Sequence, residues 1–402
     1  MTNNADTPIS ARSAQSRRQF LKTGIAAGAG FAPMINFGRF AASAADAAAG
    51  GPTYSARAID LVNRSLVMDM LAILANLTDM LGAGFSANAK TLDGMAISDA
   101  QLEKLRSSGI NIFHPAVGLG GRDNALNFVA RLNGYAASRP DAFRRIDKVA
   151  DMDLAKSQKR IGYIIGIQGS DHFEQPDDVN EFYNLGQRVS QLTYNSQNRI
   201  GSGSTDRADG GVSDFGASII ERMNDVGMAI DVSHCGDRTT LDAFALSKRP
   251  VLITHSNVRA LVDGQPRCKT DEAIRKMAKS GGVMGISGVR NFVRNKEPTT
   301  IEHILDHFDY VAKLVGVEHL GVGSDMDMDG YDDLPADIYN QLKSGYKGSY
   351  KFRGKIDTDG FDHPKRIFDL TDGLIRRGYS DADIELILGG NFKRALGEIW
   401  KS

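Results

Sequence analysis

The chain has 402 residues, of which 42% are hydrophobic and 24% are charged, as in an ordinary soluble globular protein. A formal net charge of −1 gives no electrostatic basis for binding nucleic acid or an anionic membrane. The two cysteines, Cys235 and Cys268, are too few for a disulfide framework, and we expect both to be small buried packing residues.

The first 45 residues have the features of a twin-arginine signal peptide. Arg17 and Arg18 precede a weakly apolar stretch of alanine and glycine over residues 24–31, and Ala42-Ser43-Ala44 offers a small-residue cleavage site. We therefore expect the twin-arginine (Tat) export machinery as a partner and a periplasmic mature protein, unless the signal is kept as an anchor. No other stretch is long and apolar enough to span a bilayer, so no transmembrane segment is expected after signal removal.

From about residue 56 the sequence alternates short β-like runs with amphipathic helical segments, a pattern that predicts a parallel sheet. Most of the runs are continuously apolar, as expected for strands that are covered on both faces. The eight runs are residues 65–70, 109–113, 161–167, 189–193, 228–232, 251–254, 282–286 and 320–323. Eight β/α units predict an α/β fold of the TIM (β/α)8 barrel type, with a single domain over residues 46–402. A Rossmann-like sheet is the alternative, but no G-x-G-x-x-G follows the first strand.

Helix signals fill the gaps between the predicted strands. Ser98 to Gln101 and Thr299 to Glu302 are capping-box patterns, and a last helix is expected over about residues 381–400. His303 and His307 lie at i and i+4 on a predicted helix, and we interpret them as surface residues. Two irregular segments, residues 199–211 after the fourth strand and an insertion at about 329–363 after the eighth, are candidates for lids or pocket walls.

Polar residues stand at the carboxyl ends of several predicted strands, where barrel enzymes keep their chemistry. His234, His255 and Asp325 each end an apolar run, Gln168 ends the third strand, and Tyr194-Asn195 follow the fourth. Two neutral imidazoles and a carboxylate are an ordinary ligand set for zinc or another divalent metal. A metal of this kind activates water for hydrolysis, and a nearby carboxylate accepts the water's proton.

Three further side chains lie close to this set in the sequence. Arg267, in the loop region after the sixth strand, would make a bidentate clamp for a carboxylate if it lies near a metal. His114 ends the second strand and His172 follows Gln168 closely, and both are interpreted as structural or pocket-lining residues rather than ligands.

The pattern resembles the renal or membrane dipeptidase family, peptidase family M19, within the amidohydrolase-type TIM barrels. The resemblance runs from about residue 65 to residue 400 and is carried by several motifs in order. These are Leu192-Thr-Tyr-Asn-Ser-Gln-Asn198, Asp214-Phe-Gly, Asp231-Val-Ser-His234, Ile253-Thr-His-Ser256, Gly281-Gly-Val-Met-Gly-Ile286, Gly321-Val-Gly-Ser-Asp-Met-Asp327 and Gly390-Asn391.

The family hydrolyses dipeptides at a two-zinc centre, and the resemblance implies a role for each matching residue. His234 and His255 match the two histidines of one metal position, and Asp325 matches the carboxylate that handles the water proton. Arg267 matches the arginine that grips the dipeptide's C-terminal carboxylate. Gln168 matches a glutamate that bridges both metals, and Tyr194 matches a carbonyl-polarising histidine of the animal members. A homodimer is implied by the resemblance only.

The chain departs from the family at the other metal position. The family's first strand ends in His-x-Asp, where this chain has Leu71 and Ile73, and neither side chain binds a metal. The neutral amide of Gln168 replaces the bridging carboxylate. We therefore expect one ion, held by His234, His255 and Gln168, with Asp171 or His114 as alternative compensating ligands.

The leading hypothesis is a metal-dependent hydrolase that cleaves dipeptides or a related small amide. In it Asp325 acts as general base and then protonates the leaving amine, while Arg267, Tyr194 and Asn195 bind the small-molecule substrate. The alternative is a non-hydrolytic descendant, a periplasmic binding or tailoring protein in which Leu71 and Ile73 are apolar pocket walls. A metal-dependent isomerase or deacetylase on the same barrel is a third option.

Overall fold

The computed structural model describes residues 53–72, 97–118, 120–344 and 346–400. The predicted signal peptide and Ile73 lie outside these ranges. The unit that begins at Tyr54 carries the whole of the fold described below.

The strands form a closed parallel ring. The hydrogen-bonded orders are β1-β2-β5-β4 and β11-β10-β9-β8-β7-β6-β3, and every pairing between strands is parallel. The strands are β1 (Met68–Asp69), β2 (Ile112–Phe113), β3 (Ala116–Val117), β4 (Phe143–Arg145), β5 (Ile161–Tyr163), β6 (Ile165–Gln168), β7 (Gln187–Gln191), β8 (Ala229–Asp231), β9 (Val251–Ser256), β10 (Met284–Ile286) and β11 (Leu320–Val322).

Two of the strand positions are each built from two short pieces, which join the two sheets. β2 continues into β3, and β5 continues into β6, so each pair fills one position of the barrel. The ring closes where Met70 N donates to Val322 O at 2.9 Å and Ala72 bridges Met326 in parallel. Each of the eight predicted runs contains one of these positions, so the prediction of a TIM barrel is confirmed; β4 is an additional outer strand that the sequence did not suggest.

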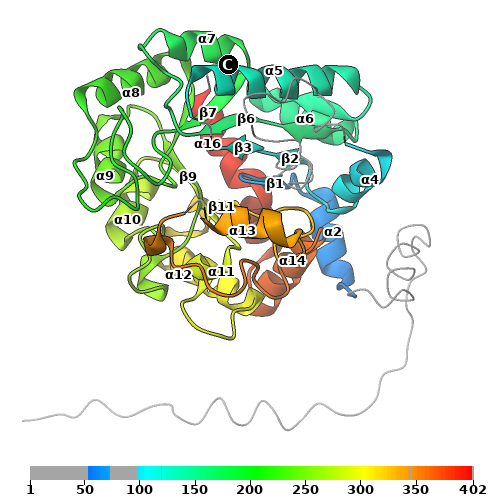
Figure 1. Cartoon of the computed structure of the whole chain (residues 1–402). Helices are drawn as coiled ribbons and strands as arrows, with labels where there is room; N and C mark the ends of the chain where they lie inside the picture. Colours follow the sequence, from blue (N-terminus) through cyan, green and yellow to red (C-terminus); the bar gives the residue numbers. More distant parts are fainter. Residues whose placement is uncertain (1–52, 73–96, 119, 345, 401–402) are drawn as a thin grey trace, which may run out of the picture. The chain divides into compact units, whose positions relative to one another are not determined.

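Helices surround the ring, as Figure 1 shows. They are α2 (Ala56–Arg64), α4 (Asp99–Ser107), α5 (Arg122–Ser138), α6 (Val149–Ser157), α7 (Asp178–Asn184), α8 (Asp214–Val226), α9 (Asp237–Leu246), α10 (Asp271–Lys279), α11 (Arg290–Val293), α12 (Ile301–Val315), α13 (Ala336–Ser344), α14 (Arg366–Arg377), α15 (Asp381–Glu385) and α16 (Asn391–Ile399). Within the described ranges, no helix has both the length and the apolar character needed to cross a bilayer.

The helix starts follow the capping chemistry of the sequence, with one shift. Ser98 and Gln101 form the predicted capping box at the start of α4. The box of α12 lies one residue later than predicted and uses Thr300 and His303, because the ring of His303 accepts the backbone N–H of Thr300. The prediction that His307 is a surface residue is wrong: its ring is fully buried, accepts Val258 N at 3.1 Å and donates to Val293 O at 2.9 Å.

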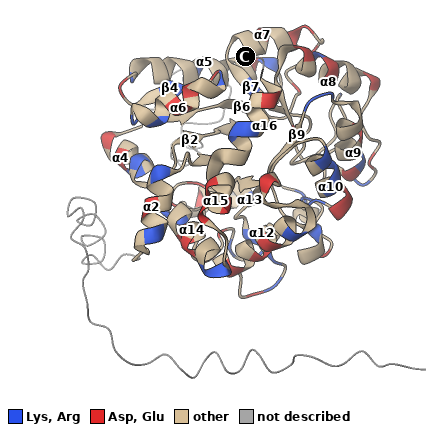
Figure 2. Ribbon diagram, turned by 180° about the vertical axis from the view of Figure 1, so that it is seen from behind, with Lys and Arg blue, Asp and Glu red and all other residues tan. Residues whose placement is uncertain are grey.

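The two ends of the barrel are covered by different parts of the chain. Helix α16 covers the amino ends of the strands and packs Phe392 against Gly321, and Figure 2 shows this helix across the middle of the rear face. The predicted C-terminal helix is not continuous, because the backbone of Gly389 in η5 (Leu386–Gly390) is not helical, with φ of 178° and ψ of −18°. Gly389 lies against the carbonyl of Leu66, where a Cβ would collide. Figure 2 also shows charges of both signs spread over the outer helices, in keeping with the small net charge.

Candidate active site

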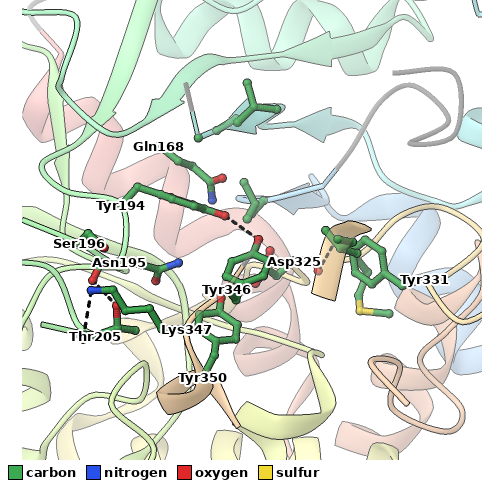
Figure 3. A pocket seen from close by; sticks show the side chains of 16 residues that line it. Gln168, Tyr194, Asn195, Ser196, Thr205, Asp325, Tyr331, Tyr346, Lys347 and Tyr350 are labelled. Atoms are coloured by element: carbon green, nitrogen blue, oxygen red, sulfur yellow. Dashed lines mark hydrogen bonds between the residues drawn. The ribbon is translucent and has the colours of Figure 1, made fainter. Parts of the chain in front are cut away.

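A pocket of about 420 Å³ opens at the carboxyl ends of the strands. It is lined by Leu71, Ala116, Val117, Gly118, Gln168, Tyr194, Asn195, Ser196, Thr205, Asp325, Met326, Tyr331, Leu342, Tyr346, Lys347 and Tyr350. Four residues that the sequence predicts for the site, Gln168, Tyr194, Asn195 and Asp325, are among them, and Figure 3 shows them facing the same space. The pocket therefore forms where the strand-end pattern predicted it.

Both irregular segments contribute to the walls of this pocket. Thr205 comes from the segment after β7, and Tyr331, Leu342, Tyr346 and Lys347 come from the insertion after β11. Lys347 Nζ lies 3.2 Å from Asp206 Oδ1, so an ion pair links the two segments at the rim. Figure 3 shows Lys347 beside Thr205 on this side of the pocket.

His234 and His255 meet behind the lining, with their Nε2 atoms 2.9 Å apart. Both side chains are buried, and Tyr194 stacks on the His234 ring with 4.4 Å between centroids. Burial and the charge of Arg267 hold the pKa of each imidazole well below its usual value, so both rings are neutral.

The partners of the other ring nitrogens decide which tautomer each histidine adopts. His234 Nδ1 lies 2.8 Å from the amide oxygen of Asn195, which only accepts, so this nitrogen carries the proton. Thr254 Oγ1 donates its proton to Asp231 Oδ2 at 2.7 Å and must therefore accept from His255 Nδ1 at 2.8 Å. Neither Nε2 then carries a proton, and the 2.9 Å contact brings two lone pairs together.

Two facing lone pairs on neutral imidazoles fit a divalent cation. Two nitrogens on one tetrahedral zinc lie roughly 3.3 Å apart, given metal–nitrogen distances of about 2.0–2.1 Å, so the rings need to separate by only a few tenths of an ångström. Asn195 and Thr254 act on the Nδ1 atoms as the outer hydrogen-bond partners of ligating histidines do in metalloproteins.

Gln168 is the third group at this point. Its amide nitrogen lies 3.1 Å from His255 Nε2, and rotating the amide by half a turn would place its oxygen there instead. Among the residues that the structure describes, no three side chains of His, Cys, Asp or Glu are grouped closely enough to hold a metal. The donor set is thus two imidazoles and one amide, which fits a single ion better than a pair.

Asp325 follows β11, the last strand of the ring, two strand positions from β9, which carries His255. Burial, which outweighs the opposing charge of Arg267 and is reinforced by Asp69, raises the pKa of its carboxyl to about 7. Its backbone is left-handed, with φ of 57°, and is fixed by a hydrogen bond from its N–H to Leu71 O at 2.8 Å. Asn195 is also left-handed, with φ of 60°, so two residues in an unfavourable conformation face the pocket, as is common at functional sites.

Arg267 does not line the pocket. It is fully buried, donates to the backbone carbonyls of Ser233 and His255, and bonds the hydroxyl of Tyr350, which does line the cavity. Lys269 is also buried, and its Nζ donates to Val232 O at 2.6 Å and Cys235 O at 3.0 Å. The two cations therefore hold the turn that carries His234.

The two residues considered as alternative metal ligands, Asp171 and His114, lie outside the pocket lining. Asp171 is exposed and accepts from Asn198 at 3.3 Å, outside the lining. His114 is buried and donates from Nδ1 to Met70 O at 2.7 Å, while its Nε2 has no hydrogen-bond partner and packs against the Cα of Gly166. His172 is a packing residue between Phe173 and Phe182 that donates to Gln187. Cys235 and Cys268 are free and buried, as expected.

Sequence reasoning missed four residues of the site. Tyr331, Tyr346 and Tyr350 come from the irregular insertion, where spacing carries no periodic signal, and only their density in one segment pointed to them. Asp231 ends the apolar run of β8 three residues before His234, a position that could have identified it as the residue that fixes Thr254.

Comparison with known proteins gives the same family from sequence and from fold. The family model for membrane dipeptidase (peptidase family M19) matches residues 59–344. Dipeptidase verJ of Clonostachys rogersoniana is 29% identical over 60% of this chain and 56% of its own length. Dipeptidase ataJ of Aspergillus terreus is 26% identical over 67% of this chain and 65% of its own length. The chain thus spans less than two thirds of the length of these curated relatives.

A solved structure resembles the chain over nearly its whole described length. The crystal structure of an amidohydrolase from Pseudomonas aeruginosa aligns with a TM-score of 0.73 and 28% identity, covering 85% of this chain and 99% of that one. The metallo peptidase of Rhodobacter sphaeroides with a phosphinate mimic of a dipeptide aligns with a TM-score of 0.66 at 17% identity, a likeness of fold alone. With the family model covering well over half of the residues, the chain belongs to the membrane dipeptidase family, peptidase family M19, a family of hydrolases.

Proposed function

We propose that the protein is a metal-dependent hydrolase that cleaves a small amide, a dipeptide or a related compound, at the pocket described above. The observation that carries the proposal is the pair of unprotonated Nε2 atoms of His234 and His255, which face each other at 2.9 Å. Family membership supports a divalent metal in general; zinc, and one ion per chain, are our proposal for this site.

His234, His255 and Gln168 would hold the ion. When bound, it would supply the Lewis acidity that polarises an amide carbonyl and activates water. The other steps fall to residues of the chain.

Asp325 accepts a proton from the attacking water and passes it to the nitrogen of the leaving amine. A carboxyl whose pKa is raised to about 7 suits both transfers near neutral pH. The reaction consumes one water and one amide and gives one carboxylic acid and one amine, so the proton that Asp325 takes up is returned.

The hydroxyl groups of Tyr194 and Tyr346 provide hydrogen bonds for the carbonyl oxygen. They lie 2.8 Å apart, so one donates to the other and the second keeps its proton for an acceptor in the pocket. Burial raises the pKa of both phenols, which keeps them as donors.

We also propose that the protein works in the periplasm after export by the twin-arginine route. The support is the Arg17-Arg18 signal, and folding around a metal before export would be compatible with that route. Fusing residues 1–45 to a reporter and following its appearance in the periplasm of wild-type and Tat-deficient cells tests this.

The decisive experiment measures bound metal and turnover together. Protein exported through its own signal should carry about one equivalent of a divalent metal. It should hydrolyse dipeptides or N-acyl amino acids, and the double variant His234→Ala, His255→Ala should lose both the metal and the turnover. Metal-free protein that hydrolyses either substrate, or a double variant that retains full metal, would contradict the proposal.

A further inference from the structure

The pocket has an apolar wall where the carboxyl end of β1 meets β11. Leu71 is 4% exposed and lines the pocket together with Asp325, and the two backbones are joined by the hydrogen bond from Asp325 N to Leu71 O. Ala116, Val117, Met326 and Leu342 continue this wall. A small apolar group of a ligand would find close packing here, but no polar partner.

Phenol rings form another part of the lining. Tyr346 stacks on Tyr350 with 4.5 Å between centroids and 30° between planes, and Tyr194 stacks on His234. Figure 3 shows the hydrogen bond that joins the hydroxyls of Tyr194 and Tyr346, which are 2.8 Å apart. Flat rings of this kind, of which Tyr350 is buried and Tyr194 and Tyr346 are partly exposed, pack well against a planar apolar group.

The charges around the pocket favour an anion over a cation. Of the described residues that line it, Asp325 alone bears a carboxylate, and the proposed reaction already uses that group. Arg267 and Lys269 are buried outside the pocket lining, and in the described part of the chain their side chains donate to backbone carbonyls and the Thr240 hydroxyl rather than to carboxylates. Arg267 bonds the hydroxyl of Tyr350, which lines the pocket, so its positive charge lies one side chain away from the cavity.

These features discriminate between the two ends of a possible substrate. The amino group of a free dipeptide is largely protonated at neutral pH, and burying an ammonium without a counter-charge is strongly unfavourable. A free carboxylate at the other end would lie near Lys347 at the rim, whose charge is shared with Asp206, and near the positive charge of Arg267 behind Tyr350. An acyl group without an amine fits the wall of Leu71 and the phenol rings.

We propose that the site selects N-acyl amino acids, in which an apolar or aromatic acyl group replaces the amino-terminal residue, over dipeptides with a free ammonium group. The inference rests on the proposed hydrolase function and narrows its substrate class. The proposal concerns the acyl group only. It does not specify which amino acid is released as the leaving amine.

A pair of compounds that differ only in the ammonium group tests the proposal. L-phenylalanyl-L-leucine and 3-phenylpropanoyl-L-leucine share the ring, the amide and the carboxylate. Zinc-loaded full-length protein should cleave the second with a kcat/KM at least tenfold higher. Equal values, or a preference for the dipeptide, would overturn the selectivity while leaving the hydrolase function standing.

Binding measurements distinguish a failure of the proposed selectivity from a failure of the proposed hydrolase function. If neither compound is cleaved, calorimetry with the same two compounds decides. Binding of 3-phenylpropanoyl-L-leucine at least tenfold tighter than that of the dipeptide supports the selectivity, although the hydrolase function then fails. Equal binding, or binding of neither, overturns the selectivity.

A single substitution should reverse the preference. Leu71→Glu would place a second carboxylate in the pocket lining that Leu71 shares with Asp325 and give an ammonium group a partner, so the ratio of the two kcat/KM values should shift toward the dipeptide by at least tenfold. Leu71→Gln has the same size without the charge and should keep the wild-type ratio. A shift of equal size in both variants would show that size, not charge, sets the ratio and would count against the proposal.

Discussion

At the scale of single residues, the site depends on hydrogen bonds that fix two imidazole rings. Asn195 holds His234 through its amide oxygen, although it does not touch the opposing Nε2. Glycine tolerates the φ of 60° at this position, so Asn195→Gly removes the side-chain amide while the backbone keeps its conformation. We expect the affinity for zinc to fall by about 10- to 100-fold, as for other outer partners of ligating histidines.

Competition with a chelator of known affinity measures this change. Ser196→Ala is the matched control, because Ser196 is exposed, adjacent in sequence and lines the same pocket. Unchanged zinc affinity in the glycine variant would show that Asn195 does not orient the ring.

Asp325 should give the activity its dependence on pH. Because its pKa is raised to about 7, the carboxyl is protonated in acid and kcat/KM should rise with pH through that value. Asn tolerates the left-handed backbone at this position, so Asp325→Asn isolates the loss of the base, and we expect turnover to fall by about 10²- to 10⁴-fold.

The same group should destabilise the fold at neutral pH. A carboxyl whose pKa is higher in the folded than in the unfolded chain binds more protons when folded, so stability falls as pH rises from about 4 to about 7. Asp325→Asn removes this effect and should raise the free energy of unfolding by about 2 kcal/mol above pH 7, allowing for partial exposure of the side chain, and by little below pH 4. Denaturant unfolding at several pH values checks both the sign and the window.

At the scale of elements, the barrel strands pack so closely that a single methyl group is excluded. The ring of His114 occupies the space where Gly166 of β6 would carry a Cβ. We expect Gly166→Ala to cost about 1–3 kcal/mol of stability, because the ring must shift within a filled interior. The double variant with His114→Ala should recover part of that loss, and additive losses in the cycle would contradict the contact.

The insertion after β11 adds side chains to the site that the barrel strands do not supply. Its phenol rings reach the pocket from a segment whose backbone is held by Gln265 and Asn291, which both donate to Tyr350 O. This anchoring explains why an irregular stretch presents ordered side chains at the strand ends.

At the scale of the whole molecule, metal binding should be coupled to folding. A ligand that binds only the folded chain stabilises it, by about 2.7 kcal/mol at a free concentration of 100 times the dissociation constant. We therefore expect added zinc to raise the melting temperature of protein from which a chelator has removed the metal. The variant with both His234→Ala and His255→Ala should show no such rise, and an equal rise in it would place the ion elsewhere.

The sequence by itself determined the architecture and the neighbourhood of the site. Strands covered on both faces are continuously apolar, so the eight runs are visible in the sequence. Polar residues at the ends of several runs mark the barrel mouth, because parallel strands end together. His234, His255, Gln168 and Asp325 were all found in this way. Membership of the M19 family followed from the same motifs.

Only the tertiary structure decided how these residues act. The tautomers of the two histidines depend on Asn195 and Thr254, whose positions follow from strand register and from a loop, not from spacing along the chain. Arg267 faces backbone carbonyls and the hydroxyl of Tyr350 rather than the open pocket, because the insertion after β11 packs over it. A sequence lists which groups are present, but hydrogen-bond partners and charge balance arise from contacts between segments far apart in the chain, and these require the fold.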